Sequence, residues 1–534
     1  MTRACARVRR GTLRGALLLV VFALIAMPGG LLAKQASPEA AGGGTLIGGF
    51  DVGPGGCPEC FNPLQATAGF TWLEKYYSKL MLYDVDFTAI QGELAESWEI
   101  SADATQYTIK LRPGVTWHDG QPFTSADVKF TIELAKNPDS ASYIGAKFSG
   151  VTAIETPDDL TVVITLGAPN AAVLDAFTFL VMLPKHALEA IAPADLVQSD
   201  WWRTNPIGTG PFKWSQHKPG EYVELVAYDD YWRGRPKLDK IINRFFPEAG
   251  SSVIALRSGE IQFTYLSTDE ALALEGNPDI TVLSGPSQVV NVLGFDMTDP
   301  RFQDVRVRQA FMYAIDRQAI VDQLYQGQAT LVPCAYVLDK YLPADANAYA
   351  PDPEMARSLL QEAGWDSSKP VEEVTYYTDQ LSTDVLVTIQ QMLADVGVTL
   401  DLRAVDVPTY NQIMGAPDDW DVTYAGAANG PDPDVMSTHF ESKAQNPTAL
   451  NRSNISDPEL DRLFVEGRQA TDADQRAQIY QQVCKVMNEQ VYWAPMWVTT
   501  RFGGASTKIG NFVWTPAPGG GRFYDAAESW TIAA

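Results

Sequence analysis

The most regular pattern in the chain is a pair of short segments in which apolar and polar residues alternate. Trp98 and Ile100 stand between polar neighbours in the first segment. Tyr107, Ile109 and Leu111 do so in the second, after a Ser-Ala-Asp-Ala-Thr turn. A period of two is typical of half-buried β-strands. We therefore predict an antiparallel hairpin here.

Helical and strand patterns also alternate later in the first half. Thr124 and Ser125 precede apolar residues that continue to Phe130, which is the local sign of a capped helix. The segment Leu160 to Leu166 is rich in β-branched residues and follows a Pro-Asp-Asp turn, so we predict a strand. The first half is therefore expected to be mixed α and β.

The second half repeats this mixture. Asp304 to Arg317 carries apolar residues at helical spacing. Asp352, Pro353 and Glu354 start another predicted helix, which Gly364 ends. The helical pattern Val385 to Val396 precedes an alternating strand, Val398 to Leu402, as in an α/β layer. A second mixed lobe is expected.

The N-terminus has the pattern of a cleavable signal peptide. Five arginines precede the apolar run Ala16 to Met27, and small residues follow it. This run is short for a membrane anchor, which needs about 20 apolar residues. Arg9 and Arg10 loosely match a twin-arginine signal, so Sec and twin-arginine export both stay open. We predict a signal peptide at residues 1–33 and a flexible, Gly-rich tether at residues 34–44.

Charge and length restrict the protein class. The net charge of −25 becomes about −30 when the leader leaves with five arginines and no acid. Such a surface repels nucleic acid and anionic lipid, so neither is an expected partner. The mature chain exceeds the roughly 250 to 300 residues that one hydrophobic core serves, which favours two large lobes.

Cysteines indicate disulfides rather than a metal site. Cys57, Cys60, Cys334 and Cys484 remain after the leader, an even number in an oxidising compartment. One or two disulfides are expected, and the pairing stays open. The close pair Cys57 and Cys60 resembles half of a zinc site, but there is no second pair and only four scattered histidines. No metal or cofactor is expected.

A secreted glycoside- or peptide-hydrolysing enzyme is the alternative from another functional class. The 65 acidic residues make paired carboxylates unavoidable, and no spacing singles out two of them. The chain has no G-x-S-x-G elbow, no H-E-x-x-H helix and no phosphate loop. We assign no catalytic residue.

Several longer segments carry a family resemblance. Leu94 to Gly120, Asn205 to Phe212, Tyr231 to Leu238 and Leu256 to Ile261 occur in the order found in the family 5 solute-binding proteins of ABC importers. The chain resembles this family, the peptide- and nickel-binding group, as far as about Pro495. The resemblance implies a carrier and not a catalyst.

The resemblance also implies a fold. It is an α/β, two-lobed periplasmic-binding-protein-like fold of type II, in the large cluster C form, with an extra subdomain in the first lobe. The chain would cross between the lobes near Val282 to Phe295 and return near Pro495 to Phe502. The expected parts are a first lobe of residues 45–283 and 503–534, with a subdomain of about 66–204, and a second lobe of residues 284–502.

The ligand class stays open because of one loop. In peptide-binding relatives, an aspartate before an aromatic-Pro-Asp-Pro sequence pairs with the amino terminus of the ligand. Here Asn429 holds that position, and Gly430 replaces the aromatic residue. Asp432 and Asp434 lie nearby and could bind ligand or cap the next segment. Oligopeptides, dipeptides, oligosaccharides, opines and nickel chelates remain candidates, and the few histidines weaken the last.

Candidate contacts come from both lobes. The resemblance makes residues 57–64 a cleft loop of the first lobe. Tryptophans could stack on a ligand, and Trp72, Trp420, Trp493 and Trp497 are available. The predicted ligand-binding residues are Glu59, Phe61, Trp72, Tyr424, Ala428, Asn429, Asp432 and Trp497.

The expected function is that of a periplasmic or otherwise extracytoplasmic carrier. It would capture a peptide-like or other small solute between two hinged lobes and deliver it to the permease of an ABC importer. We expect a monomer without a nucleic-acid partner.

Overall fold

The computed structural model describes most of the chain. The described residues are 43–50, 59–65, 73–246, 248, 250–415, 419–428, 430–443, 450–516 and 524–533. The predicted leader and nearly all of the tether lie outside them, as do Cys57, Trp72 and Asn429. In the described part of the chain, no helix is long and apolar enough to cross a membrane.

A large sheet contains strands from both halves of the described chain. Eleven of its described strands are joined, in the order β15-β14-β16-β12-β17-β11-β1-β10-β9-β8, with β13 also paired to β17. These strands are β1 (Thr45–Gly49), β8 (Phe212–Lys218), β9 (Tyr222–Ala227), β10 (Lys240–Arg244), β11 (Phe263–Leu266), β12 (Ile280–Phe295), β13 (Ala329–Thr330), β14 (Val371–Thr375), β15 (Leu400–Ala404), β16 (Val422–Ala428) and β17 (Trp493–Ser506).

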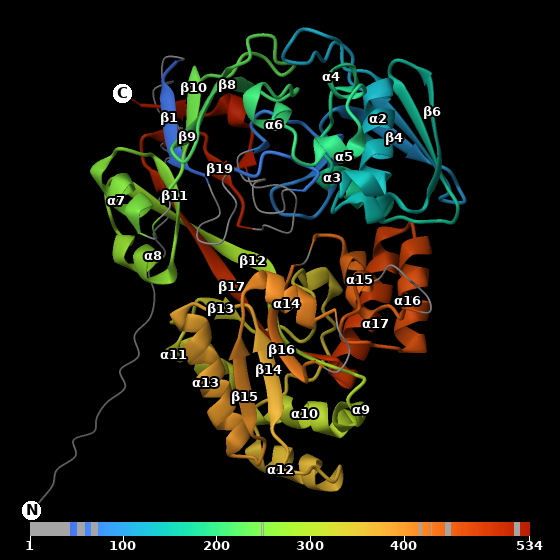
Figure 1. Ribbon diagram of the computed structural model, residues 1–534, viewed down its shortest axis with the longest axis vertical. Helices are drawn as coiled ribbons and strands as arrows, with labels where there is room; N and C mark the ends of the chain where they lie inside the picture. The colour runs from blue at the N-terminus through green and yellow to red at the C-terminus, as the bar shows by residue number, and fades with distance from the viewer. Residues whose placement is uncertain are drawn as a thin grey trace, which may run out of the picture. The chain divides into compact units, whose positions relative to one another are not determined.

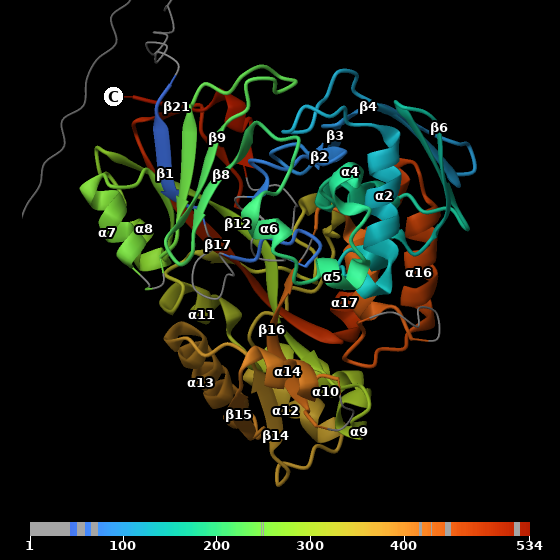
Figure 2. The same cartoon turned by 45° about the horizontal axis from the view of Figure 1, so that its top comes forward.

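Strands β12 and β17 join the two ends of this sheet and lie side by side (Figures 1 and 2). They pair antiparallel along most of their length, but the register shifts between Pro286 and Val290. Gln288 lies in this interruption with a φ of 53°. Both segments in which the chain is expected to cross between the lobes fall within these strands.

A smaller four-stranded sheet, β4-β5-β7-β6, packs with α2 in the first half (Figure 1). The predicted hairpin, helix and strand are confirmed here, and Thr124 forms a capping box with Asp127. However, Ile100 is exposed and Trp98 is only half-buried, because β4 is the edge strand of this sheet. The bounds are β4 (Ala95–Ile100), β5 (Gln106–Leu111), β6 (Val151–Asp158), β7 (Thr161–Leu166) and α2 (Ser125–Lys136).

Short elements complete the first half and the C-terminus. The loop around Gly208 and Gly210 approaches another part of the backbone closely, because a Cβ at Gly208 would lie 1.8 Å from the Tyr76 carbonyl oxygen. Neither glycine needs a positive φ. The elements are β2 (Met81–Tyr83), β3 (Ile90–Gly92), α3 (Val173–Phe179), α4 (Lys185–Leu188), α5 (Pro193–Leu196), α6 (Trp201–Thr204), α7 (Ser251–Ser258), α8 (Thr268–Leu274), β18 (Ile509–Gly510), β19 (Val513–Trp514), β20 (Tyr524–Asp525) and β21 (Thr531–Ile532).

Helices surround the sheet of the second half. The three predicted helices are confirmed as α10, α12 and α13, and Asp304 and Asp352 cap the first two. The predicted strand after α13 is β15. The helices are α9 (Pro300–Gln303), α10 (Val305–Ala314), α11 (Arg317–Gln323), α12 (Pro353–Glu362), α13 (Gln380–Ala394), α14 (Val407–Ile413), α15 (Ser437–Phe440), α16 (Pro458–Gln469) and α17 (Ala473–Gln490).

Each half buries its own hydrophobic core. One cluster includes Phe50 and Trp117 and takes in Trp530 from the C-terminus. A separate cluster, around Phe295 and Phe311, lies in the second half. Separate cores are what two lobes require, since a chain of this length does not fold around one core.

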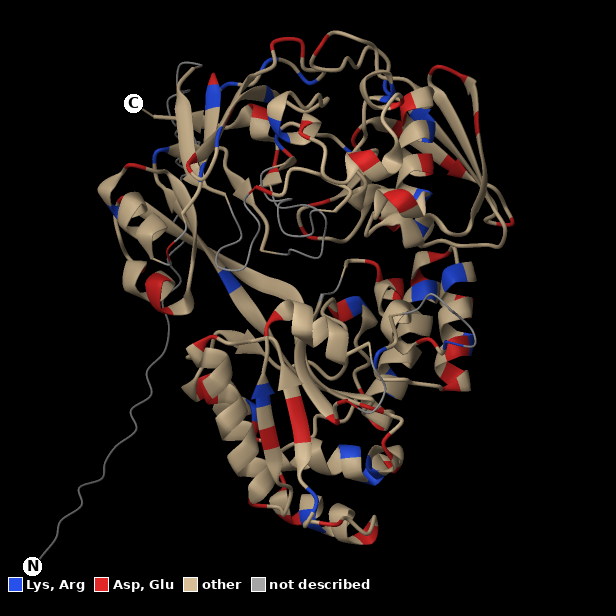
Figure 3. Ribbon diagram, in the orientation of Figure 1, with Lys and Arg blue, Asp and Glu red and all other residues tan. Residues whose placement is uncertain are grey.

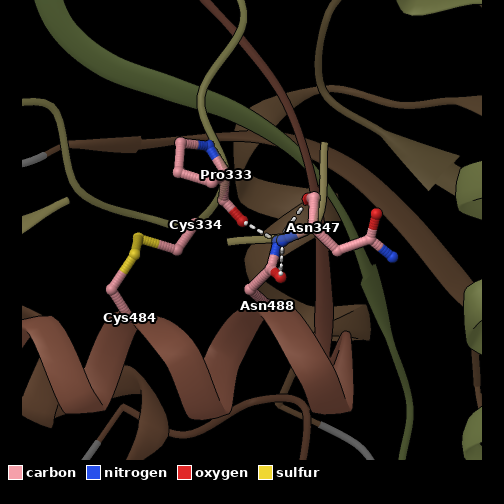
Figure 4. Close-up of a disulfide and its surroundings, with 5 residues drawn as sticks. All are labelled: Pro333, Cys334, Asn347, Cys484 and Asn488. Carbon is pink, nitrogen blue, oxygen red and sulfur yellow. Dashed lines mark hydrogen bonds between the residues drawn. A yellow bond between two sulfur atoms is a disulfide. The ribbon is translucent and has the colours of Figure 1, made fainter. Parts of the chain in front are cut away.

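A disulfide closes a long loop in the second half. Cys334 and Cys484 are bonded across 150 residues. The bond attaches α17, which contains Cys484, to the loop that follows β13 (Figure 4). Beside them, the Asn488 amide donates to the carbonyl oxygens of Pro333, at 2.8 Å, and Asn347, at 2.9 Å. Cys60 is also disulfide-bonded. No group of three metal-ligating side chains occurs among the described residues.

Candidate ligand-binding site

A cavity of about 410 Å³ opens beside β16 in the second half, and residues of α14 also line it. Small residues of β16, namely Ala425, Gly426 and Ala427, form one wall and leave the space open. A Cβ at Gly426 would lie 2.5 Å from the Tyr377 hydroxyl, so this backbone is also closely packed. We call this cavity the β16 pocket. Its other walls include Tyr376, Tyr410, Trp420, His439, Arg452 and Trp493.

Aromatic rings dominate these walls, and the polar atoms of Trp493 and Tyr410 have partners within the protein. The ring centroids of His439 and Trp493 are 5.2 Å apart. The Trp493 indole N–H donates to Ser453 Oγ at 2.9 Å, and the Tyr410 hydroxyl lies 3.0 Å from Thr423 Oγ1. The pocket therefore offers mainly apolar ring surface, which suits an apolar or aromatic group of a ligand.

His439 is a neutral wall of the pocket at neutral pH. Burial, with a smaller contribution from Arg452, lowers the pKa of His439 to about 4. No described residue forms a hydrogen bond with its ring nitrogens. The imidazole can therefore donate one hydrogen bond and accept one, but it carries no charge.

The charge of the β16 pocket is unusual for this acidic chain. No acidic residue lines it in the described part of the structure, and Arg452 is the only charged residue that does. Arg452 Nη2 donates to Asn411 Oδ1 at 3.1 Å, and its guanidinium lies 5.9 Å from the Tyr410 ring centroid. The pocket is therefore locally positive in a protein of net charge −25.

Two predicted residues meet in a different cavity, of about 650 Å³, in the first half. Glu59 Oε1 lies 2.6 Å from His217 Nε2 and accepts from the Gly220 N–H at 3.1 Å. Phe61 is buried and packs edge-on against Trp214 and His217, with ring centroids 5.4 and 4.9 Å away. Glu59 and Phe61, which are two positions apart in the sequence, thus line the same cavity.

Two other predicted residues lie in the core. Tyr424 is 1% exposed and Trp497 is fully buried, with ring centroids 6.4 Å apart. Successive side chains of a strand point to opposite faces. Tyr424 therefore faces away from the pocket that Thr423 and Ala425 line. Their ligand contact stays a prediction.

Ala428, Asn429 and Trp72 cannot be placed at the pocket. Ala428 is the last residue of β16, but its side chain is not described. Asn429 and Trp72 lie outside the described residues.

Asp432 belongs to a buried ion cluster, which we define as Asp432, Asp434, Arg468 and Arg476. Arg476 donates to both carboxylate oxygens of Asp432, at 2.7 and 2.8 Å. Burial acts to raise the pKa of Asp432, but Arg476 outweighs this and the pKa is lowered. Asp432 also caps the short 3-10 helix η4 (Pro433–Met436), so the capping interpretation is confirmed.

Asp434 completes this ion cluster. It accepts from Arg468 at 3.2 Å and from the Tyr480 hydroxyl at 2.9 Å. Burial raises the pKa of Asp434 to about 6, although Arg468 opposes this. Both acids of the loop are therefore satisfied inside the protein.

Most residues of the β16 pocket were not among those predicted from the sequence. Trp420 and Trp493 were among the tryptophans considered, but Tyr376, Tyr410, His439 and Arg452 were not. They come from segments that local patterns do not connect. The run of small residues from Ala425 to Ala428 was the available signal, because small side chains on a sheet face leave space.

Sequence comparison identifies related proteins. The family model for bacterial extracellular solute-binding proteins, family 5, middle, matches residues 89–448. A Brucella melitensis protein, whose name describes it as an ABC transporter peptide-binding protein, is 45% identical over 504 residues, covering 93% of this chain and 95% of its own. The glutathione-binding protein GsiB of Pectobacterium atrosepticum is 30% identical over 458 residues, covering 82% and 85%.

Solved structures agree with the fold. The ABC transporter substrate-binding protein CtaP of Listeria monocytogenes has a TM-score of 0.81 at 27% identity, covering 92% of this chain and 99% of its own. The oligopeptide-binding protein AppA of Bacillus subtilis, in complex with a nonapeptide, has a TM-score of 0.78 at 25% identity, covering 93% and 100%. The family match, the relatives and the shared fold agree, and the chain therefore belongs to the bacterial extracellular solute-binding proteins of family 5.

Proposed function

We propose that this protein binds a peptide between its two lobes and delivers it to an ABC importer. The observation that carries the proposal is the 45% identity to the Brucella relative described as peptide-binding, which extends over nearly the whole of both chains. The complex of AppA with a nonapeptide supports the same ligand class. As a family 5 solute-binding protein, the chain is a carrier, so the alternative of a secreted hydrolase is not supported.

The β16 pocket supports a peptide ligand from the side of the second lobe. Its volume of about 410 Å³ falls in the range of small-molecule sites, roughly 300 to 1,000 Å³. Glu59 and Phe61 would contact the ligand from the first lobe, and Ala428 and Asn429 from the end of β16. Trp72, Tyr424, Asp432 and Trp497 complete the proposed contact set.

Lobe closure would convert binding into a signal for the importer. A ligand shifts an open–closed equilibrium only through contacts that favour the closed state, and a shift from 1:99 to 99:1 needs about 5.5 kcal/mol. The register shift in β12 and β17 is a suitable hinge, because few residues absorb such rotations. The lobes would comprise residues 45–283 with 503–534, and residues 284–502.

The proposed function also includes the export of the protein and its partner in transport. The leader at residues 1–33 would be cleaved on export, and the mature chain would act as a monomer outside the cytoplasm. Its protein partner would be the permease of the importer.

A thermal-shift and calorimetry screen of the mature chain tests the ligand class. The panel contains peptides of two to nine residues with free termini, oligosaccharides, opines and nickel chelates. We expect saturable stabilisation by peptides, because a ligand at 100 times its Kd stabilises the bound state by about 2.7 kcal/mol. Stabilisation only by another class would overturn the peptide assignment, and steady consumption of a ligand would restore the enzyme hypothesis.

A further inference from the structure

We infer that the β16 pocket binds the C-terminal residue of the ligand, with the pocket walls around a large apolar side chain and Arg452 on the free α-carboxylate. This inference deepens the proposed function and rests on it. It assigns a direction to the peptide and a preference for its last residue.

Arg452 has a charge that the protein does not neutralise. Among the described residues it has no carboxylate partner, and the only hydrogen bond of its guanidinium is the 3.1 Å contact from Nη2 to Asn411. By contrast, nearby Arg468 and Arg476 each meet aspartate within 3.2 Å. A guanidinium presents several N–H groups in a planar fork that matches a carboxylate. Arg452 therefore has donors available for an anionic group.

The surroundings hold Arg452 near the pocket rather than leaving it free. Its guanidinium lies 5.9 Å from the centroid of the Tyr410 ring, whose hydroxyl is in turn 3.0 Å from Thr423 Oγ1 on β16. Asn411 lies one residue beyond Tyr410 on the same helix, α14. The two contacts from α14 place the cation over the same wall that lines the cavity.

The rest of the pocket requires an apolar group. Trp420 is 4% exposed, and the tilted rings of Trp493 and His439, with centroids 5.2 Å apart, line the same pocket. No acidic residue lines the pocket among those described, so an amino terminus would find no countercharge there. A C-terminal apolar residue is the part of a peptide that carries an apolar side chain and a free carboxylate on the same α-carbon.

Matched ligands and variants test the role of Arg452. Affinities are measured by calorimetry for phenylalanine-ending peptides of two to nine residues and for their C-terminal amides, on the wild type and on Arg452→Gln. We expect the wild type to bind the acid at least about tenfold more tightly than the amide, as charge-assisted hydrogen bonds allow. Arg452→Gln should lose this difference.

The control is Arg257→Gln, which removes the same charge from an exposed position on α7. It should leave the acid–amide ratio unchanged. Equal binding of acid and amide by the wild type, or a ratio that survives Arg452→Gln, would overturn the assignment while leaving the proposed function intact. If no peptide binds to any variant, the proposed function fails, and this inference fails with it.

A second variant tests the walls. Ala425→Leu adds a side chain from β16 into the pocket. We expect a peptide ending in phenylalanine to lose at least about tenfold in affinity, and one ending in alanine to change little. Thermal unfolding checks that the variant is folded. An equal loss for both peptides would contradict the proposed place of the side chain.

Discussion

The β16 pocket is lined by strand β16, and the two acids of the ion cluster follow the same strand. Within the described part of the chain, the charged side chains of the cluster are paired with one another, whereas the charged side chain of the pocket is not. In the cluster, each aspartate meets an arginine within 3.2 Å, and basic and acidic residues are interspersed on α16 and α17 (Figure 3). In the pocket, Arg452 has no carboxylate partner among the described residues. Asp432 and Asp434, which follow β16, are thus paired within the protein, whereas the charged group at the pocket is a guanidinium without a carboxylate partner in the described chain.

The ion cluster also contacts the first half of the chain. The Ala171 N–H donates to the Arg468 carbonyl oxygen at 2.7 Å. Burial raises the pKa of Asp175, and Asp432 raises it further while Lys147 opposes them. Charges from both halves therefore influence one another here, whereas the β16 pocket lies wholly within the second half.

The largest effect should come from breaking the ion cluster. Arg476→Met leaves Asp432 buried without its partner, so we expect the free energy of unfolding to fall by about 3 to 5 kcal/mol. Urea denaturation measures this. Arg462→Met is the control, because its pairs with Glu459 and Glu466 are exposed to solvent and should contribute far less to stability. Equal losses in the two variants would show that the cluster is not special.

The next effect concerns the covalent support of α17, which carries Arg476. Replacing Cys334 and Cys484 by serine opens a loop of 150 residues, and we expect a loss of about 2 to 4 kcal/mol in unfolding free energy. The acid–amide preference should be unchanged, since neither cysteine lines the β16 pocket. A changed preference would mean that the cluster and the pocket are coupled.

Glu373 on β14 sharpens the comparison, because it is a fully buried acid that forms no ion pair with any described residue. Burial raises the pKa of Glu373 from 4.5 to about 8, and one carboxyl oxygen accepts from the Tyr424 N–H at 2.9 Å. Because the folded pKa is raised, its contribution to stability is complete below pH 4.5. That contribution is lost as the pH rises through about 8.

Glu373→Gln should remove this loss. At pH 8.5 we expect the variant to gain a few kcal/mol in unfolding free energy relative to its difference from wild type at pH 4, because burial raises the pKa by more than three units and each unit corresponds to about 1.4 kcal/mol. Urea denaturation at both pH values measures the change. A difference independent of pH would mean that Glu373 does not titrate in this range.

The smallest expected effect is on the stability of Arg452→Gln. The residue is exposed and makes one side-chain hydrogen bond, so unfolding free energy should change by less than about 0.5 kcal/mol. A loss above about 1 kcal/mol would make Arg452 a structural residue like those of the ion cluster.

Local signals predicted the elements better than they predicted the site. The cap, proline and closing glycine around α12 act within one helix, so Asp352 and Gly364 mark its ends as expected. Ile100 was expected on a half-buried face, but it is exposed. Its strand lies at the edge of the sheet, and only the pairing of distant strands determines which strand takes that place.

The arrangement of the site depends on contacts between residues that are far apart in the sequence. Whether Tyr424 or Ala425 faces the pocket depends on which side of β16 the core covers, and both residues fit a strand. The pairing of Asp432 with Arg476, 44 residues later, could not be expected from the segment around Asp432. No pattern within a few residues contains that information.

By itself, the sequence determined the mixed α/β class, the ends of several helices and, through its resemblance, the solute-binding family. These depend on hydrogen bonds and periodicities within a few residues, or on motifs long enough to be specific. Only the tertiary structure decided that Asp432 and Asp434 meet arginines and that Arg452 meets no carboxylate among the described residues. A charge is free or paired according to neighbours from distant segments, and the fold alone brings these together.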